Sequence, residues 1–489
     1  MNPLLKYLTF FLFGIILHQS QVFGQNLINS AVNQFKNEKI NRNSSISIKA
    51  VDVNSNEILA EYNADSAIIS ASTTKLFSTY AALSILGQEY RNSTKLYMEG
   101  SVSNNGVLHG NLWIKGGGDI SLSSRYFDYA PDSLSFLKSW IDSLKKMGVT
   151  QINGAIISDG SSHGYKGAPL GWGKEDLGNY YGSHAQGINF YDNTVLVGFN
   201  TSSPGKNSSI NFIWPEMDSL SFENEVKSAN IKNDRAYLFG EPYQYNRIAK
   251  GSLPAYKDTF VVKGSMPDPE FLLAKLFVKE LSENGISVSQ GGFGVREYWF
   301  LEKGNYEEMF LVSEILGATT LDIVQVTNHK SVNLFAEGLL NSIGYVKFQD
   351  GSTDKSIQCL YDFYGSKFDI GGLILNDGSG LSRENRISAN HFISLLKEIH
   401  SSDIFEQFYN SLPIAGKSGT VKSLCSDKSG EGRIHAKSGT LSNVKSYVGY
   451  IESKSGRTIA FAFTVNDFSC TNYQIVKYME NVLNALSEI

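Results

Sequence analysis

Ser72-Thr73-Thr74-Lys75 leads directly into the run Leu76-Phe77-Ser78-Thr79-Tyr80-Ala81-Ala82-Leu83. The run is apolar and rich in alanine and leucine, which is typical of a buried helix, and the Ser/Thr residues before it favour a helix start. Residues three apart share one face of a helix, so Ser72 and Lys75 are expected to be neighbours in the first turn. The helix dipole would favour negative charge developing near Ser72. This is the arrangement that a serine nucleophile with a lysine base requires.

The S-x-x-K pattern alone is weak evidence, because serine and lysine are common residues. Its simpler interpretation is a capped helix with a surface lysine. The position of Lys75 argues against that interpretation, since a lysine that leads straight into an apolar helix is costly to bury without a purpose. Partners further along the chain therefore decide the matter.

The length and composition indicate a globular protein with room for two or three domains. The chain has 489 residues, of which 42% are hydrophobic and 19% charged, so it is long enough for a sizeable core and is not disordered. A formal net charge of -5 gives no indication of nucleic-acid binding. The 45 glycines and 12% aromatic residues suit a β-rich or mixed fold with many turns.

The N-terminus predicts a signal peptide over residues 1–24. A positively charged start, Met1 to Lys6, precedes an apolar run from Tyr7 to Leu17, and Val22-Phe23-Gly24 offers a cleavage site before Gln25. The alternative is an uncleaved membrane anchor, for which the run is short. No cysteine follows the cleavage site, so a lipid anchor is not expected. No other stretch is long enough to cross a bilayer.

The cysteines and histidines predict neither a metal site nor a cofactor. The exported chain retains Cys359, Cys425 and Cys470, an odd number that leaves at least one thiol free and allows one bridge of unreadable pairing. The histidines are scattered and form no metal-ligand motif. Gly116-Gly117-Gly118-Asp119 is expected to be a turn and not a phosphate loop, because no G-K-[ST] closes it.

Changes in residue composition divide the chain into three parts. Residues 25–92 contain an expected hairpin, from Ser45–Val53 and Glu57–Tyr62, and the Ser72 helix. Residues 93–265 are rich in Gly, Ser, Asn and Tyr with short alternating strands, which predicts one or more β-rich domains. Residues 266–489 return to long helices and strands. The aromatic stretch from Leu170 to Asn193 is expected to be core of the β-rich part.

The expected elements place the remaining motifs. Strands are predicted over residues 152–158, 444–450 and 458–465, and helices over residues 26–35, 132–147, 270–284, 334–340, 387–400 and 471–487. Ser331-Val332-Asn333 precedes one of these helices, and Lys437-Ser438-Gly439-Thr440 runs into a pair of strands.

Three motifs in one order, S-x-x-K, S-x-N and K-S-G, are the arrangement of the penicillin-recognising serine enzymes. Ser72 would attack a carbonyl, and Lys75 must be neutral to take its proton. Burial and the nearby charge of Lys437 would lower the pKa of Lys75. Chance matches to each triplet are easy, and to the ordered set much rarer.

The other motif residues have matching chemical roles. Ser331 can relay the proton to the leaving amine, and Asn333 can hold Lys75 and the substrate amide. Lys437 and Ser438 can bind a terminal carboxylate. Gly439 lets substrate pass close to a strand edge. The N–H groups of Ser72 and Thr440 would form the oxyanion hole, each donor being worth about 3–4 kcal/mol in such enzymes.

A second copy of the K-S-G motif competes for this assignment. Lys417-Ser418-Gly419-Thr420 has the same four residues as Lys437 to Thr440. The later copy is preferred because it runs into Leu441 and alternating strands, as an edge strand beside the site should. The earlier copy precedes a charged, Gly/Ser-rich loop, and Lys417 is expected to be dispensable.

The sequence resembles the low-molecular-mass class C penicillin-binding proteins, the D-alanyl-D-alanine carboxypeptidases/endopeptidases of the penicillin-binding protein 4 type. The resemblance covers most of the mature chain, and Gly116–Asp119 shares in it. Its densest segments are Ala71–Lys75, Ser331–Glu337, Asp377–Ser382, Leu412–Gly416 and Ala436–Leu441. The resemblance implies an α/β (α+β) fold, a β-lactamase/transpeptidase-like domain with an antiparallel sheet flanked by helices. Residues 25–92 and 266–489 would form this domain, and residues 93–265 would be the insert.

The resemblance also implies the activity. Ser72 would be acylated by a peptidoglycan stem peptide, with loss of terminal D-alanine and then hydrolysis, and some members cleave the D-alanyl cross-link instead. β-Lactams should acylate the same serine, and the implied location is the periplasm of the cell envelope. Peripheral membrane association and oligomeric state are left open.

Two residues depart from the family pattern. Val332 stands where the family usually has aspartate, and Ser438 where it usually has threonine. Serine keeps the hydroxyl, so altered rates or selectivity are expected and not inactivity. Two alternatives stay open: a β-lactamase or esterase on the same scaffold, and a non-catalytic cell-wall-binding protein.

Overall fold

The computed structural model describes residues 24–127, 134–217, 219–297 and 304–489. The predicted signal peptide therefore lies outside the described residues, except for Gly24. In the described part of the chain, no helix combines the length and apolar character needed to cross a bilayer. Cys359, Cys425 and Cys470 are all free thiols, and the first two are buried.

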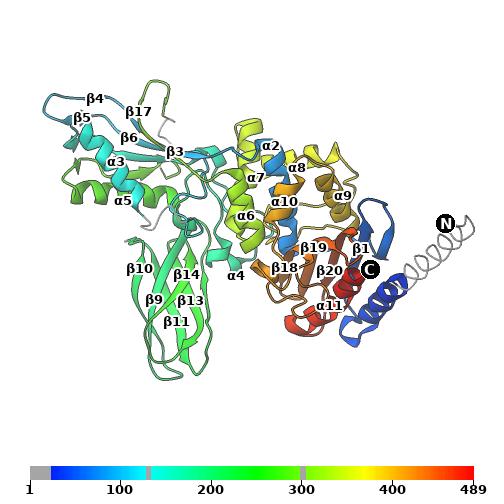
Figure 1. Ribbon diagram of the computed structural model, residues 1–489. Coiled ribbons are helices and arrows are strands. Elements are labelled where there is room, and N and C mark those ends of the chain that lie inside the picture. Colours follow the sequence, from blue (N-terminus) through cyan, green and yellow to red (C-terminus); the bar gives the residue numbers. More distant parts are fainter. Residues whose placement is uncertain (1–23, 128–133, 218, 298–303) are drawn as a thin grey trace, which may run out of the picture.

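The described part of the chain forms two lobes (Figure 1). A five-stranded sheet is the centre of the first lobe. Its order is β18-β19-β20-β1-β2, and every neighbouring pair is antiparallel. The expected hairpin near the N-terminus is confirmed as β1 and β2, and β1 pairs along its whole length with β20. The bounds are β1 (Ser45–Asp52), β2 (Ile58–Tyr62), β18 (Ile434–Leu441), β19 (Val444–Glu452) and β20 (Thr458–Asn466).

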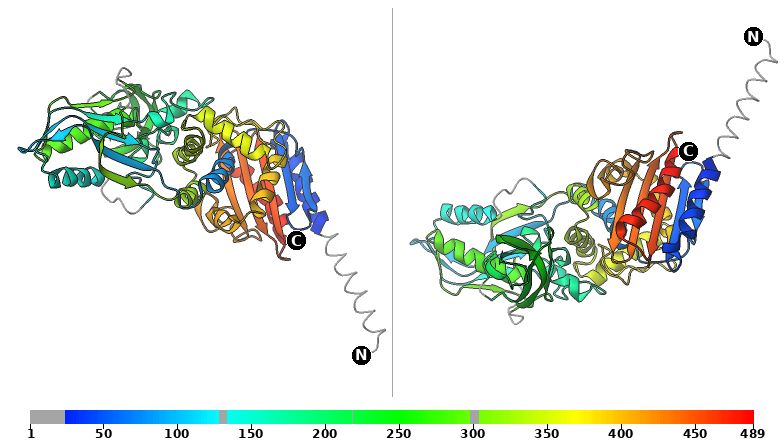
Figure 2. Two further views of the ribbon diagram at one scale, coloured as in Figure 1. Left: turned by 90° about the horizontal axis from the view of Figure 1, so that it is seen from above. Right: turned by 90° about the horizontal axis from the view of Figure 1, so that it is seen from below.

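Helices cover both faces of this sheet, as the family resemblance implied. One face packs against a core built by α2 (Lys75–Leu86), α6 (Thr320–Lys330), α7 (Asn333–Phe348), α8 (Thr353–Gly365), α9 (Ala389–His400) and α10 (Phe405–Ser411). The other face carries α11 (Asn472–Glu488) beside a helix over residues 24–37 (Figure 2). In α2 nine consecutive residues from Lys75 to Leu83 are buried, because apolar side chains cover all sides of this helix.

The second lobe lies across α6 and α7 from the main sheet (Figure 1). It contains two sheets with parallel and antiparallel pairs, ordered β16-β8-β6-β3-β17 and β15-β7-β5-β4, and two three-stranded sheets, β10-β9-β14 and β11-β13-β12. Helices α3 and α5 pack into the same core. The bounds are β3 (Ser93–Met98), β4 (Ser101–Val102), β5 (Val107–His109), β6 (Leu112–Gly116), α3 (Ser135–Lys146), β7 (Gln151–Ile152), β8 (Ile156–Asp159), α4 (Lys174–Leu177), β9 (Thr194–Thr201), β10 (Ser209–Trp214), β11 (Ser221–Ala229), β12 (Arg235–Phe239), β13 (Asn246–Pro254), β14 (Lys257–Ser265), α5 (Pro269–Glu283), β15 (Ser287–Val288), β16 (Gly292–Gly294) and β17 (Phe310–Leu316).

The second lobe continues beyond residue 265, where the texture had suggested its end. Helix α5 packs in the core of this lobe, and β17 pairs with β3 so that Leu316 lies opposite Ser93. The inserted part therefore extends to about Leu316. The single strand expected over residues 152–158 is also wrong, because β7 and β8 belong to two different sheets.

Candidate active site

The predicted nucleophile lies in a tight turn and not in the α-helix itself. Ala71–Thr74 form a 3₁₀ turn, and α2 begins at Lys75. Ala71 has a positive φ of 51°, an uncommon conformation for a residue with a side chain. Thr73 and Thr74 each donate a hydroxyl hydrogen bond to a carbonyl of the preceding residues, Ser70 (2.8 Å) and Ala71 (2.9 Å). These bonds fix the turn and leave Ser72 partly exposed.

Lys75 is the centre of the polar contacts. Its side chain is fully buried, and Nζ donates to Ser72 Oγ (3.0 Å), Asn333 Oδ1 (2.6 Å) and the Ser379 carbonyl (2.6 Å). Three acceptors match the three hydrogens of an ammonium group. Burial lowers the pKa of Lys75 to about 7, against the opposing charges of Asp377 and Glu337. The lysine therefore changes protonation near neutral pH.

The S-x-N residues lie in the turn between α6 and α7. Ser331 ends α6 with a left-handed φ of 63°, and Asn333 begins α7. The Asn333 side chain accepts from Lys75 through Oδ1 and donates through Nδ2 to the Tyr181 carbonyl (2.8 Å). Val332 lies between them at the start of α7. The turn therefore orients Asn333 by one contact on each side.

Lys437 joins the K-S-G strand to the S-x-N turn. Its ammonium is buried and donates to Ser331 Oγ (2.8 Å) and to the Ser438 carbonyl (2.8 Å). Burial lowers the pKa of Lys437, and the charges of Lys75 and Lys445 add to that effect. The structure thus brings all three predicted motifs together.

Gly439 allows β18 to pass against the nucleophile turn. A Cβ atom placed on it would lie 2.5 Å from the Ser70 carbonyl oxygen and 3.1 Å from the Ser72 nitrogen. A side chain at this position would push the strand away from Ser72. The spacing between the K-S-G strand and the serine turn therefore depends on this glycine.

Two buried carboxylates that the sequence did not single out hold the loop after α8. Asp377 accepts from the backbone N–H of Gly380 (2.8 Å) and Ser382 (2.7 Å), and Glu337 accepts from Gly378 (3.0 Å) and Ser379 (2.8 Å). Burial and Asp377 raise the pKa of Glu337 to about 8. These bonds aim the Ser379 carbonyl at Lys75. The segments containing Asp377 and Glu337 belong to the family resemblance, which was the available signal.

The aromatic stretch expected to be core of the β-rich part contributes to the site. Trp172 packs with Leu381 and donates through its indole N–H to Asp377 Oδ2 (2.8 Å). Tyr181 supplies the carbonyl that holds Asn333, and Tyr181 and Ser331 both line a cavity of about 120 Å³. Phe190 is buried in the core of the second lobe, as expected. The insert therefore forms one wall of the site.

The earlier copy of the K-S-G motif lies against the later one. Thr420 accepts a hydrogen bond from the Ser438 hydroxyl (2.8 Å), while Lys417 is 58% exposed and pairs with Glu431. A Cβ on Gly419 would lie 2.6 Å from the His329 carbonyl, so this turn packs against the end of α6. Thr420 of the earlier copy therefore contacts the preferred motif, which the sequence analysis did not predict.

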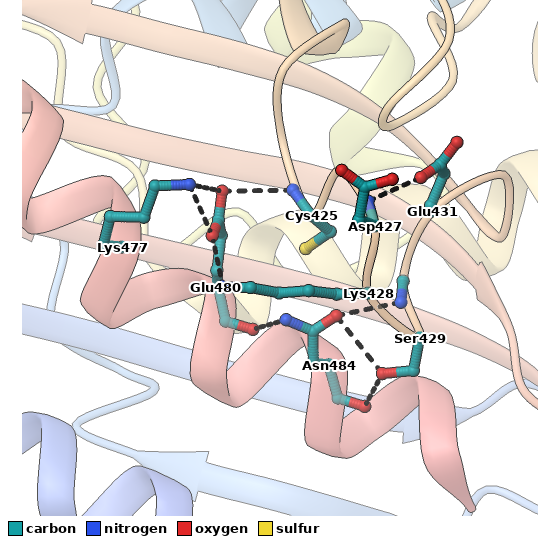
Figure 3. A network of polar contacts seen from close by, with 9 residues as sticks. Cys425, Asp427, Lys428, Ser429, Glu431, Lys477, Glu480 and Asn484 are labelled. Atoms are coloured by element: carbon teal, nitrogen blue, oxygen red, sulfur yellow. Dashed lines mark hydrogen bonds and ion pairs between the residues drawn. The ribbon is translucent and has the colours of Figure 1, made fainter.

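A buried glutamate on α11 anchors the loop that follows Thr420 (Figure 3). Glu480 accepts from the Cys425 backbone N–H (3.1 Å) and forms ion pairs with Lys428 (2.8 Å) and Lys477 (3.0 Å). One turn further along α11, Asn484 accepts from the Gly430 N–H (2.9 Å). The loop is therefore fixed at its far end to the helix behind the sheet.

Comparisons with known proteins agree with this architecture. The family described as "D-Ala-D-Ala carboxypeptidase 3 (S13) family" matches residues 29–485. The D-alanyl-D-alanine carboxypeptidase DacB of Haemophilus influenzae is 26% identical over 490 residues, covering 92% of each chain. The D-alanyl-D-alanine carboxypeptidase of Actinomadura sp. strain R39 is 26% identical over 439 residues, 86% of this chain and 78% of that protein.

The fold matches a solved structure over nearly the whole chain. The crystal structure of penicillin binding protein 4 from Haemophilus influenzae superposes with a TM-score of 0.79 at 23% identity, covering 94% of this chain and 99% of that one. This match confirms the expected fold class, a transpeptidase-like domain with additional domains. The chain belongs to the D-Ala-D-Ala carboxypeptidase 3 (S13) family, which confirms the class of activity that its three motifs predicted.

Proposed function

We propose that the chain is a serine D-Ala-D-Ala carboxypeptidase/endopeptidase that cleaves peptidoglycan stem peptides through an acyl-enzyme on Ser72. The observation that carries the proposal is the triple contact of the buried Lys75 ammonium with Ser72, Asn333 and the Ser379 carbonyl. A buried lysine whose pKa lies near neutrality, in hydrogen-bond contact with a serine hydroxyl, can act as its base.

Acylation begins with attack by Ser72 Oγ on the carbonyl carbon of the penultimate D-alanine. The hydroxyl proton passes to neutral Lys75, and the carbonyl oxygen becomes negatively charged. The backbone N–H groups of Ser72 and Thr440 stabilise that oxyanion, each contributing about 3–4 kcal/mol. The close approach of β18 to the serine turn at Gly439 supports this pairing of donors.

Loss of the leaving group requires a proton on its nitrogen. Ser331 relays that proton: its hydroxyl gives its own proton to the nitrogen and takes one from the Lys437 ammonium, which donates a hydrogen bond to it. Lys437 and Ser438 bind the terminal carboxylate of the substrate, while Asn333 holds the substrate amide. Collapse of the tetrahedral intermediate releases D-alanine, and water then hydrolyses the ester on Ser72.

The same serine would react with β-lactams, which present a strained amide beside a carboxylate. A crystal structure of the Haemophilus influenzae penicillin binding protein 4 is described as complexed with a novel β-lactam, which supports this expectation.

The predicted signal peptide supports export, and we place the enzyme in the periplasm. Ser438 keeps the hydroxyl of the usual threonine, and Val332 leaves Ser331 and Asn333 in place on either side of it, so these departures change rates and not the reaction.

Mass spectrometry with benzylpenicillin tests the proposal directly. We expect one stable adduct on the mature protein, located on the peptide that contains Ser72, together with release of D-alanine from a D-Ala-D-Ala peptide. Rapid turnover of the drug without a lasting adduct would support a β-lactamase instead. Absence of both an adduct and peptide hydrolysis would support a cell-wall-binding protein.

Lys417→Ala separates the two copies of the K-S-G motif. Lys417 is exposed and its ion pair with Glu431 is at the surface, so the substitution should change the rate of acylation by benzylpenicillin by less than about threefold. Ser438→Ala, on the later copy, should slow acylation clearly more. The reverse ranking, measured by stopped-flow kinetics, would show that the earlier copy binds the carboxylate.

A further inference from the structure

A third lysine lies beneath the K-S-G strand, outside every motif. Lys445 is on β19 directly opposite Thr440 of β18. It exposes only 9% of its surface, and its Nζ donates to Thr440 Oγ1 (2.7 Å) while lying 4.9 Å from the centre of the Tyr447 ring. Thr440 itself is exposed. The ammonium group is therefore held against the hydroxyl of an exposed residue on the edge strand of the sheet.

Neither Lys445 nor Lys437 has a carboxylate partner among the residues that the structure describes. Buried charges in proteins are normally paired, because removing an ion from water is costly. Burial lowers the pKa of Lys445 to about 8, and the charge of Lys445 contributes to the lowered pKa of Lys437. Two partly desolvated cations thus lie near one strand edge and attract an anion to it.

The strand register places the relevant groups on one face. Alternate residues of a strand share a face, so the Ser438 and Thr440 side chains lie on the same side of β18. Lys445 shares that side because it is the direct partner of Thr440. Since Lys445 donates to the Thr440 oxygen, the hydroxyl hydrogen of Thr440 is available to donate to another acceptor.

We propose that Lys445 determines specificity for the substrate's terminal carboxylate, by orienting the Thr440 hydroxyl as a donor and by adding a second positive charge beside Lys437. This inference rests on the proposed function, in which Lys437 and Ser438 bind that carboxylate. Lys445 acts on the carboxylate through Thr440 and by its field, and takes no part in proton transfer.

The test compares benzylpenicillin with its methyl ester, in which one methyl group caps the carboxylate and removes its charge. Second-order rate constants of acylation are measured for the wild-type protein, Lys445→Met and Lys445→Arg. Lys445→Met should reduce the preference for the free acid by about tenfold, the effect of losing one charge-assisted contact. Lys445→Arg should retain most of that preference. Lys454→Met is the matched control, because Lys454 is half-exposed and pairs with Glu488.

Thr440→Val provides a second route to the same conclusion. It keeps the side-chain volume and removes the hydroxyl, so it should reduce the preference too, and Lys445→Met should add little in its background. Equal losses toward acid and ester in Lys445→Met would overturn the inference, because they indicate a merely structural lysine. An unchanged preference would overturn it as well.

The wild-type result separates this inference from the proposed function. A wild-type protein that reacts equally with the acid and the ester would refute the carboxylate site of the K-S-G strand as a whole. A wild-type preference for the acid that survives both Lys445→Met and Thr440→Val would leave the proposed function standing and remove only the role of Lys445.

Discussion

Ser72→Ala should give no covalent adduct with benzylpenicillin and no measurable release of D-alanine. The substitution removes the only atom that we propose forms the acyl ester, and loss of the nucleophile in serine hydrolases costs on the order of 10⁶ in rate. Ser72 is partly exposed, and the turn around it is held by Thr73 and Thr74, so the fold should be unaffected. Intact-mass spectrometry after prolonged incubation measures the adduct.

The thermal unfolding midpoint serves as the control for Ser72→Ala. A midpoint close to that of the wild-type protein shows that the missing adduct reflects missing chemistry and not a lost fold. An adduct that persists on the variant would identify a different nucleophile. Ser331, whose hydroxyl contacts Lys437, would then be the first residue to examine.

Lys75→Ala should slow acylation by at least about 10³-fold, within the range by which a positioned general base accelerates catalysis together with the orientation it provides. The pH profile gives the sharper readout. Below the lysine's pKa of about 7 the ammonium has no lone pair and cannot accept the serine proton, so the wild-type acylation rate should rise with pH through about 7. Lys75→Ala should lack this rise.

Lys75→Arg distinguishes a base from a mere positive charge. Arginine keeps the charge but stays protonated throughout the accessible pH range, so it cannot take the proton. If Lys75 only attracts the substrate electrostatically, the arginine variant should remain active. Activity near the wild-type level in Lys75→Arg, with an unchanged pH profile, would contradict the general-base role.

Local patterns predicted the elements that are regular and buried. The apolar run after Lys75 and the alternating residues of β19 and β20 are local patterns. They involve residues that are neighbours in the sequence, so this helix and these strands were predictable. The strand expected over residues 152–158 failed at Asn153-Gly154, a dipeptide that favours a turn and separates β7 from β8. The predicted end of the insert was misplaced because the residue composition of α5 is similar to that of the helices in the first lobe.

The site residues that belong to sequence motifs were predictable. Those that depend on contacts between residues far apart in the sequence were not. Ser72, Ser331 and Lys437 were found by spacing and order. Trp172 reaches Asp377 across 205 positions of sequence, and no local pattern encodes such a pair. The lowered pKa of Lys75 was expected, and burial is its largest cause. The Ser438 contact of Thr420 was missed because the motif copy was judged by its local context.

The pairing of β3 with β17 bears on how the chain assembles. Ser93 and Leu316 lie opposite each other, so the two ends of the inserted part meet at one place. Once that part has formed, the chain between α2 and α6 behaves as a short connection, and bringing Ser72 to Ser331 costs little loop-closure entropy. The main sheet is different, because β1 near the N-terminus can pair only after β20 near the C-terminus is present. We therefore expect the insert to fold early and the catalytic lobe to close last.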